Sequence, residues 1–475
     1  MSGRRRGVAS NAAWLMIADI VGKASNFVLV VIVARELGPR QYGDFAFAFA
    51  FLPLFLHLAR WGIDLTSLRR LSTGEDFSRV FVNAAALRIG FALAATGVAF
   101  ALVPLFVGDA TAVLVVLVVG AALWLDEMAI FLSVAFTAVE QLHLQAAVLI
   151  VNRVLSAILA GVVVAAGGGL VTVSVAYLAG SLAAVLLSTW FLVRRLPPVR
   201  VRDVRREDLR ELAREGAPLG VASLLNMAVF RLDAVLLRIL EGPVAVGVYG
   251  VAYRFFEPLL FVTWSLSHAA TPRLTREATG EEGRTFELSL AANLAFYLPV
   301  AVGALFTAEW LLEHLFGRRY VAADDAVMWL AASSVPYAIA HLARIAAIAA
   351  GERRVIPAVA GAVLVVNVAA NLVLIPSHGV TGAAIATFAA EVLECVLLLG
   401  IYARRVARIR LTGSLLAPVG ATACMTLVLL SGLRGASALV VGPLVFGVAL
   451  FGLARLLAPA DIRLLARSLR APEAT

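Results

Sequence analysis

The chain has 475 residues, of which 61% are hydrophobic and 15% are charged, with a formal net charge of +9 and a mean hydropathy of +0.93. A soluble domain has roughly half apolar and about a quarter charged residues, so runs such as AVLVVLVVGAALWL could not be shielded from water here. The composition excludes a soluble globular protein and predicts a polytopic membrane protein.

The predicted elements are helices. A helix needs about 20 mostly apolar residues to cross the hydrocarbon, and the alternating segments of roughly ten residues expected of transmembrane strands are not found. This criterion predicts an all-α protein with about 14 transmembrane helices. In chain order they cover approximately residues 11–34, 43–65, 80–106, 111–139, 146–166, 170–193, 216–240, 246–270, 285–308, 326–350, 355–376, 380–402, 413–433 and 437–458.

The positive charges indicate the topology. If the N-terminus is cytoplasmic, about 27 Lys and Arg residues fall in cytoplasmic segments and about 6 in outer loops. Both termini are therefore expected in the cytoplasm. The net charge follows from this topology and from attraction to the anionic inner leaflet, so no nucleic-acid partner is expected. The basic stretch RRLPPVRVRDVRREDLRELAREG carries five acidic residues and is interpreted as a surface linker between spans.

A repeated turn indicates the domain organisation. Gly38-Pro39 and Gly242-Pro243 lie about 200 residues apart, and each pair is followed by a further glycine, Gly43 or Gly247. This separation equals six spans, so the two copies would have the same orientation in the bilayer, as in a parallel repeat of two bundles. The predicted division is an N-terminal lobe (1–200, helices 1–6), a C-terminal lobe (201–406, helices 7–12), and helices 13–14 with a cytoplasmic tail (407–475).

The loops offer little for catalysis. None is long enough for an extramembrane catalytic domain, and there is no Gly-rich phosphate loop. Cys395 and Cys424 fall inside predicted spans, and the six His residues show no ligand spacing, so neither a disulfide framework nor a metal site is indicated. We therefore expect no catalytic residues, no metal and no cofactor, and the protein is predicted not to be an enzyme.

Cationic residues inside the spans are candidate ligand-binding groups, because each costs about 2.5–3.5 kcal/mol to insert at mid-membrane. Lys23, Arg231 and Arg254 lie nearest the middle or the outer half of their spans. Lys23 can pair with Asp19 four residues earlier, and Arg254 with Glu257 three residues later. Arg231 has only Asp233 nearby, two residues away and on another side of the helix. These cations either meet an anionic ligand, for which Arg suits phosphate, or bridge acidic residues of neighbouring helices.

Two acidic pairs also lie within spans: Asp126 with Glu127, and Glu391 with Glu394. A site for a coupling ion, sodium or proton, needs carboxylates in the membrane, so these four are candidates for ion coupling; the membrane potential is the alternative energy source. Interhelical hydrogen bonding explains them equally well.

Several local patterns resemble those of oligosaccharide flippases of the polysaccharide-export (Wzx-like) type, in the superfamily that also holds lipid II flippases and multidrug exporters. The patterns are NAAWLMIADIVGKASNFVLVVIVARELGPRQYGDFAFA, RLDAVLLRILEGPVAVGVYGVAYR, SHAATPRLTR, LFGRRYVAADDAVMWLA and NLVLIPSHGVTGAAIATFAAE, which together span most of residues 11–402.

The resemblance implies alternating access by two lobes around a polar cavity, with the polyprenyl tail of the substrate in lipid. Lys23, Arg231 and Arg254 match, by depth and chemistry, the need to bind the substrate pyrophosphate. Asn26 and Asn226 are candidates for hydrogen bonds to the sugar. Asp19, Asp233 and Glu257 would be cavity or lobe-pairing acids, and their charges could cancel part of the cationic field.

The predicted function is therefore flipping of a polyprenyl-pyrophosphate-linked oligosaccharide from the cytoplasmic to the outer leaflet for cell-surface polysaccharide assembly. The expected partners are this lipid-linked substrate and membrane lipid, with other polysaccharide-assembly membrane proteins as candidates. One alternative is an ion-coupled drug or metabolite exporter on the same fold. An alternative of another class is a membrane polysaccharide polymerase or ligase. Such an enzyme would need a large outer loop with paired catalytic groups, and the largest outer loop here covers only residues 309–325.

Overall fold

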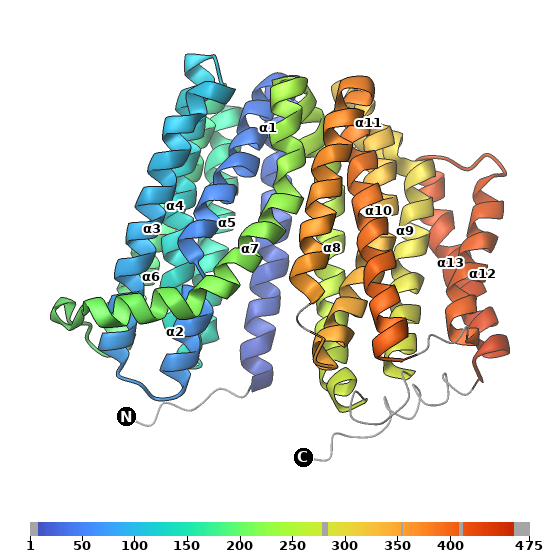
Figure 1. Cartoon of the computed structure of the whole chain (residues 1–475). Helices are drawn as coiled ribbons and strands as arrows, with labels where there is room; N and C mark the ends of the chain where they lie inside the picture. Colours follow the sequence, from blue (N-terminus) through green and yellow to red (C-terminus); the bar gives the residue numbers. More distant parts are fainter. Residues whose placement is uncertain (1–7, 278–283, 353–354, 408–411, 460–475) are drawn as a thin grey trace. The chain divides into compact units, whose positions relative to one another are not determined.

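The structure is a computed structural model that describes residues 8–277, 284–352, 355–407 and 412–459 (Figure 1). Within these ranges every regular element is a helix and no strand is present. The all-α prediction is confirmed, and the predicted span ends agree with the helix ends to within a few residues for most spans.

The chain divides into two compact units, Met1–Gly250 and Val251–Thr475, called here the N-terminal and C-terminal units. The N-terminal unit contains the start of α8 and, in order, α1 (Val8–Arg60), α2 (Ile63–Ser72), α3 (Phe77–Phe106), α4 (Ala110–Ala138), α5 (Leu142–Ala165), α6 (Leu170–Arg195), η1 (Val201–Asp203) and α7 (Arg206–Leu240). The C-terminal unit contains the rest of α8 (Pro243–Glu277), then α9 (Arg284–Phe316), η2 (Arg318–Ala323), α10 (Asp324–Ala349), α11 (Ile356–Arg405), α12 (Gly413–Leu429) and α13 (Ala436–Leu457). The repeat-based division at residues 200 and 406 remains a prediction.

Ten helices in the described residues are long and apolar enough to cross a membrane, or eleven if the bent helix α7 is one span. Two of the helices are far longer than a bilayer is thick: α1 has 53 residues and α11 has 50. At 1.5 Å per residue each would measure about 75–80 Å, against a hydrocarbon core of about 30 Å. Each is broken by a glycine with positive φ, Gly38 (φ 77°) and Gly379 (φ 53°), so each contains two of the predicted spans.

Two local features differ from the prediction. The span expected over 43–65 ends at Arg60, where Trp61 and Gly62 adopt positive φ (39° and 70°) before the short helix α2 begins. The segment interpreted as a surface linker is helical from Arg206 onward and continues into the apolar part of α7 with a bend of 42°. Hydrophobic periodicity did not predict this helix because most residues of 206–215 are charged, so few apolar residues indicate its packed face.

The two Gly-Pro turns pack against each other within the N-terminal unit. Gly38 and Gly242 have φ values of 77° and 85°, which favour glycine. A Cβ on Gly43 would lie 1.8 Å from the carbonyl oxygen of Pro243, and a Cβ on Gly247 would lie 2.0 Å from that of Pro39. The second half of α1 and the start of α8 therefore cross in backbone contact, which requires the second glycine of each repeat.

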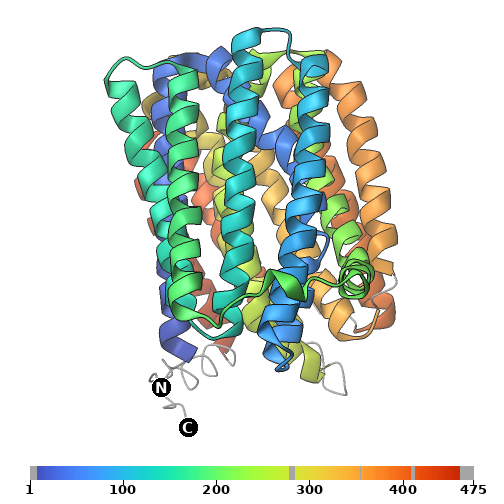
Figure 2. The same ribbon diagram turned by 90° about the vertical axis from the view of Figure 1, so that its left-hand side faces the viewer.

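In the N-terminal unit, α1 packs against α3, α4, α5, α6 and α7. Helices α3 to α6 run nearly parallel to one another, and the linker after α6 passes along the end of the bundle at which α3 begins (Figure 2). In the C-terminal unit, α10 packs on α9 and α11, and the pair α12–α13 packs on α9. Buried residues of α8 to α12 form one apolar core, and those of α12 and α13 form another with α9.

Candidate functional site

A four-residue ion network lies in the N-terminal unit where α1, α2, α3 and α4 meet, with two of its side chains buried and two partly buried. The Arg60 guanidinium donates to both carboxylate oxygens of Glu127, at 2.9 and 2.7 Å. Arg88, whose side chain is fully buried, donates to Glu127 Oε2 at 3.2 Å and lies 3.1 Å from Asp64 Oδ1. Two cations and two anions balance, as burial of charge requires. The network around Glu127, which was predicted as a coupling candidate, thus joins four helices through ion pairs.

Asp126, the neighbour of Glu127, faces a different set of helices. Its Oδ1 accepts from Asn152 at 2.6 Å and its Oδ2 accepts from the Tyr177 hydroxyl at 3.0 Å. Arg153 donates to the Tyr177 oxygen at 2.7 Å and lies 3.9 Å from Asp126. Both carboxylate oxygens are therefore satisfied by α5 and α6.

A further ion pair in the N-terminal unit joins α7 to α1. The Arg238 guanidinium lies 2.7 Å from Asp44 and 5.3 Å from the centre of the Phe47 ring, and its Nε donates to the Phe106 carbonyl. Asp44 directly follows Gly43 of the repeated turn, and Arg238 lies seven residues after Arg231 on the same helix. That i+7 spacing was the signal available, since it places both arginines on one face of α7.

The predicted cavity residues of the N-terminal unit lie on α1 and α7. Asp19 and Asn26 are partly buried on α1, and Lys23 is exposed one turn after Asp19. On α7, Arg231 is partly buried and Asn226 is exposed. Asp233 is buried and accepts a hydrogen bond of 2.5 Å from the Tyr249 hydroxyl. Asp233 thus stabilises the start of α8, and the roles predicted for the others remain predictions.

The C-terminal unit holds the remaining predicted residues. Arg254 donates to Glu257 at 2.8 Å within α8, as the i+3 spacing predicts. On α10, Arg344 forms an ion pair with Glu394 of α11. Glu391 lies one turn before Glu394, is 3% exposed, and its Oε2 has no hydrogen-bond partner among the described residues. Three of the four predicted coupling acids are therefore paired with arginine, and Glu391 is the exception.

A cavity of about 450 Å³ lies within the C-terminal unit between α8, α9, α10, α12 and α13. Its lining is almost wholly apolar and includes Phe255, Phe296, Pro299, Met425 and Phe446. A cavity of this size and chemistry can accept a hydrocarbon segment.

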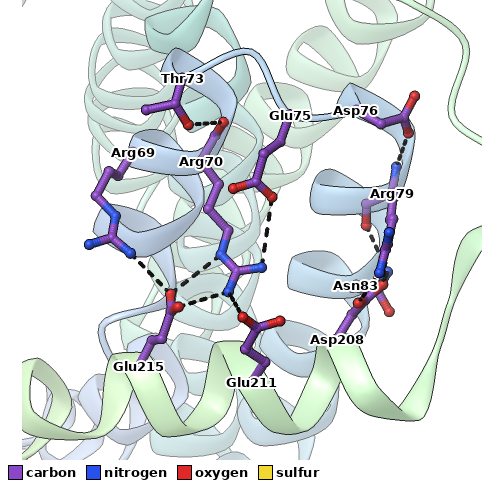
Figure 3. A network of polar contacts seen from close by, with 10 residues as sticks. All are labelled: Arg69, Arg70, Thr73, Glu75, Asp76, Arg79, Asn83, Asp208, Glu211 and Glu215. Carbon is purple, nitrogen blue, oxygen red and sulfur yellow. Dashed lines mark hydrogen bonds and ion pairs between the residues drawn. The ribbon is translucent and has the colours of Figure 1, made fainter.

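The start of α7 is held to α2 and α3 by a second, more exposed polar network (Figure 3). The Arg70 guanidinium lies 2.9 Å from Glu211 and 2.8 Å from Glu215, and Arg79 donates to both oxygens of Asp208 at 2.7 Å. The hydrogen bonds from Arg79 hold the pKa of Asp208 below its ordinary value, and those from Arg70 lower the pKa of Glu215.

The segment just before α7 is attached to the same place. Ser78 donates to Asp203 at 2.6 Å, and Asn83 donates to the Asp203 carbonyl at 2.9 Å. The Asn83 amide oxygen accepts from the backbone N–H of Arg205 at 2.8 Å. Residues 203–215 are thus fastened to α2 and α3 along their whole length.

The chain matches known families along most of its length. A family model described as polysaccharide biosynthesis protein matches residues 8–277, which is more than half of the chain. A second family model, MatE, matches residues 218–373. A comparison with curated protein sequences gave no match.

Solved structures share the fold at low sequence identity. The lipid II flippase MurJ in an inward closed conformation matches with a TM-score of 0.77 and 13% identity, covering 93% of this chain and 98% of that one. An inward-facing multidrug resistance MATE family transporter of the MOP superfamily matches with a TM-score of 0.68 and 15% identity, covering 82% and 96%. A MOP superfamily transporter from Pyrococcus furiosus matches with a TM-score of 0.60 and 16% identity, covering 82% and 94%. The chain has the flippase and MATE transporter fold, and by the extent of its family-model match it belongs to the polysaccharide biosynthesis protein family.

Proposed function

We propose that this protein flips a polyprenyl-pyrophosphate-linked oligosaccharide from the cytoplasmic to the outer leaflet of the bacterial inner membrane by alternating access, with both termini in the cytoplasm. The observation that carries the proposal is the match of residues 8–277 to the polysaccharide biosynthesis family. The fold shared with a lipid II flippase supports it, because that protein also acts on a lipid-linked substrate.

The proposed substrate contacts follow the chemistry of its three parts. Lys23, Arg231 and Arg254 would bind the pyrophosphate, for which guanidinium groups are well suited. Asn26 and Asn226 would bind sugar hydroxyls, while the acids Asp19, Asp233 and Glu257 moderate the positive field. The polyprenyl chain stays on the lipid side, where the apolar cavity of the C-terminal unit has matching chemistry.

The test is mass spectrometry of lipid-linked saccharides in a strain that lacks the gene. We expect a complete lipid-linked oligosaccharide to accumulate, and wild type to remove it. Arg231→Ala should fail to do so, whereas Arg319→Ala, which changes an exposed arginine of η2, should behave as wild type. Equal rescue by both variants would show that Arg231 has a structural role and does not bind the substrate. If no lipid-linked oligosaccharide accumulates in the deletion strain, the proposed flippase function is wrong.

Glu391 is the residue we assign to ion coupling. Asp126, Glu127 and Glu394 each have an arginine partner, whereas Glu391 is buried beside the Arg344–Glu394 pair with one carboxyl oxygen unpartnered among the described residues. Because Arg344 is paired with Glu394, a transported cation would bind at Glu391.

The coupling assignment is tested in proteoliposomes under an imposed pH or sodium gradient. Glu391→Gln should fold as wild type, since the glutamine has the same shape, and transport should no longer respond to the gradient that drives the wild type. A gradient response that survives in Glu391→Gln would contradict the assignment.

A drug or metabolite exporter is the second candidate, because the MatE model matches residues 218–373 and MATE transporters share the fold. It predicts that the deletion strain becomes sensitive to cationic compounds while its lipid-linked saccharides stay normal. The accumulation experiment separates the two functions.

A further inference from the structure

The segment from the end of α6 through the first turns of α7 is rich in arginine. Its basic and acidic side chains lie on different sides of the segment. Its arginines at 194, 195, 200, 202, 205, 206, 210 and 214 are all exposed. Among the described residues, none of Arg206, Arg210 and Arg214 takes part in an ion pair, although acids are close in sequence.

Most of the acids of this segment face the protein. Asp203 accepts a hydrogen bond from Ser78. Asp208 binds Arg79, and Glu211 and Glu215 bind Arg70 (Figure 3). Only Glu207 is exposed without such a contact. Four of the five acids of this segment are thus bound to α2 and α3, and the arginines at 206, 210 and 214 lie on the opposite side of the helix.

The exposed side has a regular geometry. Arg206, Arg210 and Arg214 follow one another at four-residue spacing, so they share an arc of about 80° on the helix surface. The same side continues with Ala217 and Val221, and Val221 is 47% exposed. One helix face therefore passes from arginine to apolar side chains, as expected where a helix runs through the headgroup layer before it enters hydrocarbon.

We propose that this arginine face (Arg206, Arg210 and Arg214) binds the phosphate groups of anionic phospholipids in the leaflet on which the linker lies. Guanidinium groups bind phosphate through paired hydrogen bonds, and the apolar continuation of the face suits a lipid better than a nucleic acid. The contacts with α2 and α3 hold the face in place, so that binding does not have to order a loose loop. The proposal does not depend on what the protein transports.

The experiment is native mass spectrometry of the full-length purified protein with added phosphatidylglycerol or phosphatidylcholine. Each basic residue near a membrane surface contributes on the order of a fivefold gain in binding of anionic lipid. We expect wild type to prefer phosphatidylglycerol, and Arg210→Gln/Arg214→Gln to lose roughly 25-fold in affinity for it. Phosphatidylcholine binding should not change, and added salt should weaken only the phosphatidylglycerol binding.

The matched control is Arg319→Gln/Arg434→Gln, which removes two exposed arginines from η2 and the α12–α13 turn. An equal loss in this control would contradict the proposal, as would equal binding of both lipids by wild type. Binding of a short nucleic acid that competes with phosphatidylglycerol for the same arginines would assign the face to another ligand. An unchanged melting temperature in phosphatidylcholine shows that the variant is folded.

Discussion

Glu127 accepts hydrogen bonds from Arg60 and Arg88, two arginines that have few other acceptors in the interior of the N-terminal unit. Removing one partner of a buried charge network costs about 3–5 kcal/mol, because the remaining charges stay buried without compensation. We therefore expect Glu127→Ala to lower the melting temperature sharply in detergent.

The control for this prediction is Glu313→Gln, which removes a carboxylate from an exposed pair with Arg318 at the end of α9. Exposed pairs contribute little, so its melting temperature should stay close to that of wild type. If Glu127→Ala melts as wild type does but loses transport, Glu127 serves coupling and the structural role is wrong.

The sequence shows which residues carry charge inside the spans, and much less about their partners. The Arg254–Glu257 pair lies within one helix and was predicted from its spacing, and the structure contains it. The partners of Arg88 and Arg238 come from helices dozens of residues away, and only the fold decides which helix faces are adjacent. The unpartnered oxygen of Glu391 could not be predicted for the same reason.

At the scale of elements, the repeated Gly-Pro turn leaves no space for a side chain at Gly43 or Gly247, where α1 and α8 cross. A methyl group at residue 43 would lie within 1.8 Å of the Pro243 carbonyl oxygen, so α1 and α8 would have to move apart. Overpacking of this kind costs typically about 1–3 kcal/mol. We expect Gly43→Ala and Gly247→Ala each to lower the free energy of unfolding by that amount, measured by denaturant titration.

Gly361→Ala on α11 is the matched control, because no atom lies within 4 Å of the added methyl group. It should be neutral or slightly stabilising, since alanine favours helix more than glycine does. If all three variants are equally stable, the close crossing of α1 and α8 is wrong. The turn was evident in the sequence, but the contact between its two copies was not.

The start of α7 should detach at low pH. The hydrogen bonds that lower the pKa of Asp208 and of Glu215 contribute stability above the unfolded pKa values of about 4, and this contribution disappears as the pH falls through the lower folded values. A nitroxide on Glu207→Cys, in a background without Cys395 and Cys424, should therefore become more mobile below about pH 4.

In Asp208→Asn the same label should already be mobile at neutral pH, because Arg79 loses its charged partner. A label whose mobility is independent of pH and of this substitution would show that the polar network does not hold the helix. The helix itself was missed by the sequence prediction, since its packed face combines the buried Leu212 with acids of the kind that usually face solvent.

At the scale of the whole molecule, the all-helical fold and the span positions were predictable because apolar length is a strong signal in membranes. Two helices nevertheless continue through the expected span boundaries, interrupted only at Gly38 and Gly379. The compact units divide at residue 250, after the start of α8 has packed on α1. Hydropathy cannot predict such packing, because it reports how apolar a segment is and not which helix the segment contacts.

The central claim, movement of a lipid-linked oligosaccharide across the bilayer, is tested most directly with purified protein in proteoliposomes. The probe is the lipid-linked oligosaccharide isolated from the deletion strain and placed in one leaflet, with its sugar detected by a membrane-impermeant oxidant on the other side. The account predicts that wild type moves the sugar to the far leaflet and that Arg231→Ala does so far more slowly. A rate equal to that of protein-free liposomes would contradict it.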